Sequence, residues 1–240
     1  MKLLALGLVA GFAAVERKGF LQAMLSRPIA LGAMAGLVAG DLDAGLTVAV
    51  PLELLWLGAV NLGAALPVHE ALGTVAIAGG AALAAEVLRA GGAGGPALLP
   101  AAAAAAVVLC APLALLGRRA ERLVERWNER LYARAEHDLA LGDDEAAARV
   151  NLYGIALPFA ISFLLAPLGA LVSATAIPLF LERVPGALPP LALGLVTLSA
   201  FSCAAGAKAM RAARAKLVYF AGLLAGLGLF AATVLAGGGP

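Results

Sequence analysis

The stretch that decides the fold runs from Arg27 to Pro67 and reads RPIALGAMAGLVAGDLDAGLTVAVPLELLWLGAVNLGAALP. It sets Asp41, Glu53 and Asn61 among Ala, Gly, Leu and Val. A charged side chain at the centre of a bilayer costs about 2.5–3.5 kcal/mol, so ionisable residues in an apolar chain indicate a substrate or ion site. Glycines and a proline interrupt the helical run, and broken helices are tolerated at membrane depth where they line a cavity.

The composition of the whole chain indicates a membrane protein. The 240 residues are 62% hydrophobic and 13% charged, with a mean hydropathy of +0.96. A soluble domain of this length could not cover so much apolar surface, so lipid is the solvent for most of the chain. The length allows about six to eight spans or half-spans. We therefore expect an all-α, polytopic integral membrane protein with broken or re-entrant helices in its N-terminal half.

The apolar segments fall at 3–15, 29–40, 44–60, 71–88, 96–116, 152–182, 187–207 and 217–236. The first is expected to be an uncleaved membrane helix, with a signal peptide as the alternative. The second and third are short and are parted by Gly40-Asp41-Leu42-Asp43. They indicate tilted or broken helices, or a re-entrant hairpin. Breaks are also expected at Pro158 and Pro167 in the long segment 152–182.

Residues 117–149 form the one strongly polar stretch, and it divides the chain into membrane regions 1–116 and 150–240. Arginines recur every four residues at Arg118, Arg122, Arg126, Arg130 and Arg134. A neighbouring face is apolar, which predicts an amphipathic helix. Arg118 and Glu121 have the spacing of a surface pair worth about 0.2–0.5 kcal/mol. Two interpretations stay open: a helix lying on the membrane surface, or an arm that docks a partner.

The distribution of Lys and Arg predicts the orientation, because these residues are concentrated on the cytoplasmic side of span ends. They gather in 117–149 and in 208–216. Both segments are therefore expected in the cytoplasm, with the turn at 183–190 outside. The connection at 16–28 is also cytoplasmic if 29–40 and 44–60 each cross the membrane.

A pattern within the opening stretch resembles a known family. It consists of Arg27-Pro28, Gly36, Gly40-Asp41, Gly45, Leu52-Glu53, Leu57-Gly58, Asn61 and Gly63-Ala64-Ala65. It is similar to the membrane IIC component of the mannose/fructose/sorbose family of the bacterial phosphotransferase system. The resemblance implies a multi-pass inner-membrane sugar permease in an oligomeric complex with a IID membrane subunit. Soluble IIA and IIB proteins would carry the phosphoryl group, so this chain would be no enzyme and would need no cofactor.

One position departs from the family pattern. The family usually carries an Asp in the turn after the Asn-x-Gly motif, and His69 aligns with it here. Glu70 is next in the chain and could supply the missing carboxylate. Alternatively, the site takes something other than the usual hexose, or this member has lost transport and acts as a regulator.

The candidate substrate-binding residues are Asp41, Glu53, Asn61, His69 and Glu70. Glu53 is the strongest, because an ionised carboxylate accepts hydrogen bonds from two sugar hydroxyls without needing to donate. Its alternative role, and that of Asp41, is to cap freed helix N–H groups. Asn61 offers both a donor and an acceptor. His69 is either a hydrogen-bond partner, a proton-linked switch or a satisfied buried histidine.

The sequence contains no catalytic motif, no Cys/His cluster with metal-ligand spacing and no nucleic-acid-binding patch. The function that the resemblance implies is hexose translocation, with phosphorylation carried by a IIB partner. Two other functions stay open: a stand-alone proton-coupled transporter, and a membrane scaffold or sensor that transports nothing.

Overall fold

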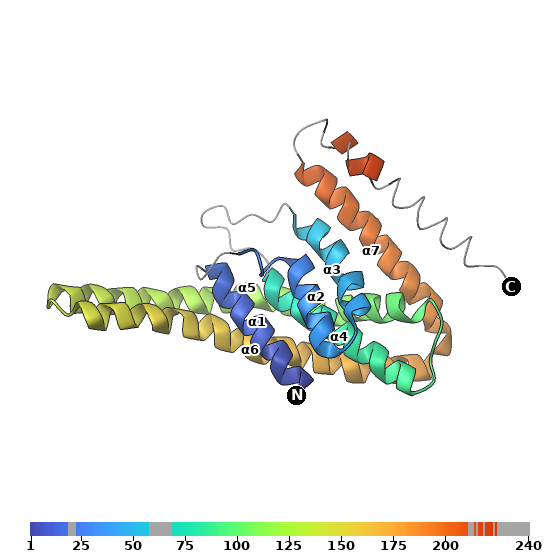
Figure 1. Ribbon diagram of the computed structural model, residues 1–240, viewed down its shortest axis with the longest axis horizontal. Helices are drawn as coiled ribbons and strands as arrows, with labels where there is room; N and C mark the ends of the chain where they lie inside the picture. The colour runs from blue at the N-terminus through green and yellow to red at the C-terminus, as the bar shows by residue number, and fades with distance from the viewer. Residues whose placement is uncertain are drawn as a thin grey trace.

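The computed structural model describes residues 1–18, 23–57 and 69–210, together with 214, 216–217, 219–222 and 224. In this part of the chain the fold is all-α and no strand occurs. The helices are α1 (Lys2–Lys18), α2 (Pro28–Ala39), α3 (Leu42–Trp56), α4 (Glu70–Ala90), α5 (Leu98–Ala140), α6 (Asp144–Arg183), a short 3-10 helix η1 (Pro185–Ala187) and α7 (Leu188–Ala209) (Figure 1). Helices α4, α5, α6 and α7 are each long and apolar enough to cross a membrane. The expected polytopic all-α fold is confirmed.

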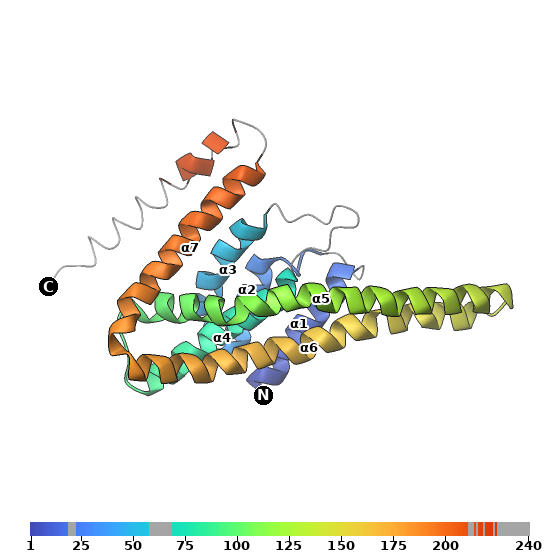
Figure 2. The same cartoon turned by 180° about the vertical axis from the view of Figure 1, so that it is seen from behind.

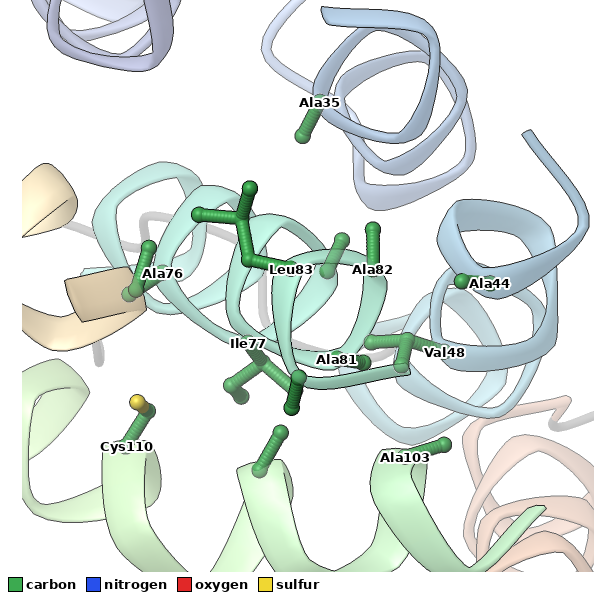
Figure 3. Close-up of a cluster of buried hydrophobic side chains, with 14 of the residues drawn as sticks. Ala35, Ala44, Val48, Ala76, Ile77, Ala81, Ala82, Leu83, Ala103 and Cys110 are labelled. Carbon is green, nitrogen blue, oxygen red and sulfur yellow. The ribbon is translucent and has the colours of Figure 1, made fainter. Parts of the chain in front are cut away.

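Helix α4 forms the centre of the bundle and packs against α1, α2, α3, α5 and α6. Figure 3 shows side chains of three neighbouring helices, Ala35, Val48 and Cys110, placed around helix α4, of which Ile77 and Ala81 are labelled. All five are buried. Small residues at such contacts let helix backbones approach closely, which is how membrane helices gain packing energy without a hydrophobic driving force.

The two short apolar pieces form an antiparallel hairpin of α2 and α3. Gly40 ends α2 with a φ of +92°, a left-handed conformation that glycine adopts without steric cost. Asp41 then caps α3, because its Oδ1 accepts the N–H of Ala44 at 2.9 Å. The helices approach so closely that a side chain at Gly45 would collide with the carbonyl oxygen of Gly32. The expectation of two short helices parted at Gly40-Asp41 is confirmed, whereas the break expected at Pro51 is wrong, since α3 continues through it.

The polar stretch is built differently from the sequence prediction. Helices α5 and α6 have 43 and 40 residues and form an antiparallel hairpin that extends well beyond the bundle (Figures 1 and 2). The single amphipathic helix predicted over 117–149 is wrong, because a turn at Leu141–Gly142 ends α5 and Asp143 caps α6. The predicted breaks at Pro158 and Pro167 are also wrong, since α6 continues through both. We call the projecting part of this hairpin, residues 122–154, the arm.

The bundle has two polar ends, and the arm projects from one of them. The arm end is defined by Arg17, Lys18, Arg27, Glu53, His69 and Glu121, and the opposite end by Lys2, Asp41, Glu86 and Arg89. The last turn of α7 also lies at the arm end, where Gly206 approaches the Leu54 carbonyl. Arg17, Lys18, Arg27 and Lys208 therefore lie at the end from which the arm projects, and the cytoplasmic orientation of this end stays a prediction.

Candidate functional site at the arm end

Glu53 joins the last turn of α3 to the first turn of α2. Its Oε1 accepts Nε–H of Arg27 at 2.9 Å and also pairs with Nη2 of that guanidinium. Its Oε2 accepts the backbone N–H of Ile29 at 3.1 Å. Arg27 is the N-cap of α2 but makes no side-chain capping bond, so Glu53 supplies the cap from the neighbouring helix. Glu53 thus has the capping role that the sequence left open, although for α2 and not for its own helix.

The same geometry leaves Glu53 with capacity for a ligand. An ionised carboxylate offers about four lone-pair positions, and three N–H donors face this one. The side chain is 20% exposed, so a further donor has access to it. A hydroxyl group of a sugar is a donor of the required kind.

His69 caps the start of α4 and is almost fully buried. Its Nδ1 accepts the N–H of Leu72 at 3.2 Å, so in the neutral ring the proton resides on Nε2. Nε2 lies 3.4 Å from Oε1 of Glu121 and 3.4 Å from Oγ of Ser162. The backbone N–H of His69 also donates to the carbonyl of Ala114 at 3.2 Å. His69 is therefore held by α4, α5 and α6 together.

Glu121 is the site residue that the sequence analysis missed. The predicted surface pair with Arg118 is wrong, because Glu121 is only 3% exposed and faces the bundle. Its carboxylate pairs with Lys18, lies 3.7 Å from Nη1 of Arg17 and contacts His69. The signal that could have found it is Gly117, four residues earlier on the same helical face, where α5 needs space for a close neighbour.

The structure brings three of the five predicted residues to one place. Glu53, His69 and Glu70 lie at the arm end, and Glu70 is within electrostatic reach of Glu53. Asp41 lies at the opposite end, where it caps α3 and accepts Nη1–H of Arg89 at 2.6 Å. Helix α3, with 15 residues, holds the two ends about 22 Å apart. Asn61 lies outside the described residues.

The chemistry available at the arm end is hydrogen bonding and charge. Among the residues that the structure describes, no three His, Cys, Asp or Glu side chains are placed to hold a metal ion. The two cysteines, Cys110 and Cys203, are buried and free. The arrangement offers hydrogen-bonding groups and fixed charges to a polar ligand.

The chain is similar to several known proteins. A family model described as "PTS system sorbose-specific iic component" matches residues 1–221. The "Putative N-acetylgalactosamine permease IIC component 2" of Escherichia coli (strain K12) is 39% identical over 71 residues, which are 30% of this chain and 53% of that protein. The chain thus spans about half the length of this curated relative.

Two solved structures have the same fold. A structure described only as that of a membrane protein has a TM-score of 0.65 at 21% identity, covering 98% of this chain and 93% of the other. A cryo-EM structure of the mannose transporter ManYZ in complex with microcin E492 has a TM-score of 0.55 at 21% identity, covering 98% and 92%. At this level of identity the likeness establishes the architecture alone.

Proposed function

The chain belongs to the family of sorbose-specific IIC components of the phosphotransferase system, and from that premise we propose that it is the sugar-translocating subunit of a mannose-family system. Members of the family are multi-pass inner-membrane transport components and are not catalytic themselves. The observation that carries the proposal is the family match over 1–221 together with a polar site in an apolar bundle.

The proposed ligand is a hexose, bound at the arm end. Glu53 would accept a sugar hydroxyl with its remaining lone pair, while Arg27 and the α2 backbone hold the carboxylate in place. His69 and Glu70, at the start of α4, would form the opposite wall. Asn61 belongs to the same proposal from the sequence pattern alone. Asp41 stays a candidate for a contact at the other end of the translocation path.

Phosphoryl transfer is assigned to partners. It needs a nucleophile or base and usually a bound metal, and the described part of the site offers no metal cluster. A IIB protein would phosphorylate the sugar at the arm end, supplied by IIA. The added charge would keep the product from crossing back through the apolar bundle.

The two partner surfaces differ in chemistry. Helices α6 and α7 expose large apolar side chains, including Leu164, Leu168, Val196 and Phe201, which suit lipid and a IID membrane subunit. The arm is polar and projects from the end that holds the site, which suits a soluble IIB protein. Asn128 of α5 faces Gly154 of α6 within the arm. Shortening the hairpin beyond these two residues should weaken IIB-dependent uptake more than co-purification with IID.

The function is tested by uptake of labelled sugar into proteoliposomes, leaving out one component at a time. We expect accumulation only when this chain, a IID partner, IIB and a phosphoryl donor are all present. Accumulation by this chain alone, driven by a proton gradient, would refute the proposal and favour a proton-coupled transporter. Sugar binding without uptake in the complete system would favour the scaffold or sensor.

A further inference from the structure

Helix α5 makes an unusually close contact with the start of α4. A side chain at Gly117 would collide with Cβ of His69 and lie 3.3 Å from Cδ2 of Leu72. Three residues earlier, the Ala114 carbonyl accepts the backbone N–H of His69. Four residues later, Glu121 faces the imidazole of His69. Two turns of α5 therefore fix both the backbone and the ring of one candidate sugar-site residue.

Several charged side chains of this junction gather around one buried carboxylate. One carboxylate, Glu121, faces two cations, Arg17 and Lys18, from the last turn of α1, and a histidine whose Nδ1 is occupied as an acceptor. At 3.7 Å the Arg17 contact is too long for a hydrogen bond, and Nη1 of Arg17 is buried without one. Burying a charge is costly unless it is paired. Glu121 is thus the carboxylate that Lys18 and the His69 ring contact, and it shares the compensation of Arg17 with Glu70.

We propose that Glu121 is a positioning residue for sugar binding, acting by holding the His69 imidazole in one orientation. The inference rests on the proposed function, since it gives His69 its place in the sugar site. The Leu72 N–H fixes Nδ1, and the Glu121 carboxylate is the only anionic acceptor that the described residues place beside Nε2. With Nδ1 accepting from Leu72 and Nε2 beside Glu121 and Ser162, the ring is held in one tautomer and one orientation. His69 would then contribute to the site through the shape of its wall and not through a free nitrogen.

The position of Glu121 gives this role a second consequence. Helix α5 continues from Glu121 to Ala140 without interruption. Glu121, which orients His69, therefore lies where the arm begins. A partner bound to the arm would act on the same helix that holds the site. Glu125, one turn further out, is exposed and provides a matched control.

The test compares Glu121→Gln with Glu125→Gln in the purified complex with its IID partner. Both variants remove one negative charge from the same helix. We expect Glu121→Gln to weaken the affinity for labelled hexose about five- to thirtyfold, which is less than the ten- to hundredfold loss for a charge-assisted hydrogen bond made to the sugar itself, because Glu121 acts through His69. Glu125→Gln should stay within about twofold of the wild type. Equal affinities for the wild type and Glu121→Gln would overturn the proposal.

A double-mutant cycle separates positioning from general stabilisation. If Glu121 acts through His69, then Glu121→Gln should add less than about a twofold loss in a His69→Ala background. Full additivity of the two losses would overturn the proposal. If Glu121→Gln alone does not yield monodisperse protein, Lys18→Gln/Glu121→Gln removes the opposite charge as well and takes its place in the cycle.

A second readout needs no sugar and so separates this inference from the proposed function. The chain contains two histidines, His69 and His137, and ¹⁵N-histidine NMR can follow both. We expect the Nε2–H tautomer at His69, with resonances that move in Glu121→Gln and stay in place in Glu125→Gln. Unmoved resonances in Glu121→Gln would refute the positioning role. If the His69 resonances move in Glu121→Gln while the wild-type complex binds no sugar, the proposed function is refuted, but the contact between Glu121 and His69 is supported.

Discussion

The two polar ends of the bundle use the same residue types in different environments. At the opposite end, Lys2 pairs with Glu86 at 2.7 Å, with side chains 41% and 55% exposed. At the arm end, Glu121 and His69 are each 4% exposed. An exposed ion pair contributes about 0–1 kcal/mol, whereas removing one partner of a buried pair costs about 3–5 kcal/mol. Substitutions of charged residues at the opposite end should therefore change the stability little, whereas substitutions at the arm end should lower it more.

The largest structural effect is expected at the junction of α4 and α5. Gly117→Ala places a methyl group against the Cβ of His69, and overpacking of this kind costs about 1–3 kcal/mol. We expect the apparent melting temperature in mild detergent to fall by roughly 3–10 °C. Gly94→Ala is the control, because nothing lies within 4 Å of a Cβ at that position. Equal melting temperatures for the two variants would show that the ends do not differ in packing.

An intermediate effect is expected from the pair that joins α2 to α3. Arg27→Gln removes a charge-assisted contact to Glu53, whose loss costs about 1.5–3 kcal/mol when the partner stays behind. Partial exposure of both side chains reduces this cost. We expect a lower melting temperature for Arg27→Gln than for Lys2→Gln, which also removes the cation of an ion pair but at the opposite end. The comparison fails if Lys2→Gln is the more destabilised of the two.

The smallest effect is expected at Asp41. Asn caps helices about as well as Asp, so Asp41→Asn loses only the attraction to the half-exposed Arg89. We expect stability to fall by less than about 1 kcal/mol, and Asp41→Ala to cost about 1 kcal/mol more because the cap is lost. Chemical denaturation in detergent measures both. A sugar affinity unchanged in Asp41→Asn would remove Asp41 from the proposed translocation path.

The sequence predicted the parts of the fold that depend on local signals. Gly40-Asp41 combines a residue suited to positive φ with a capping carboxylate, so the break between α2 and α3 was readable without a structure. The turn at Gly142-Asp143 carries the same signal, with a φ of +78° and a cap. It was overlooked because arginines recur at helical spacing through the polar stretch, and that pattern alone predicts one helix.

The candidate site was predictable in composition but not in its contacts. Glu53 stood out because it lies in an apolar segment, yet its partner Arg27 is 26 residues earlier in the chain. Glu121 did not stand out, since the polar arm is full of Glu and Arg at spacings that suggest surface pairs. Its burial depends on the last turn of α1 reaching α5, which is a long-range contact that no local pattern encodes.

The most direct test of whether the arm end binds the sugar is to compare the hexose affinities of Glu53→Gln and Glu86→Gln. The two variants make the same substitution at opposite ends of the bundle. We expect Glu53→Gln to lose roughly 1.5–3 kcal/mol of binding, about ten- to a hundredfold in affinity, because the amide loses charge-assisted acceptance. Glu86→Gln should bind as the wild type does. Wild-type affinity in monodisperse Glu53→Gln, or an equal loss in Glu86→Gln, would contradict the claim.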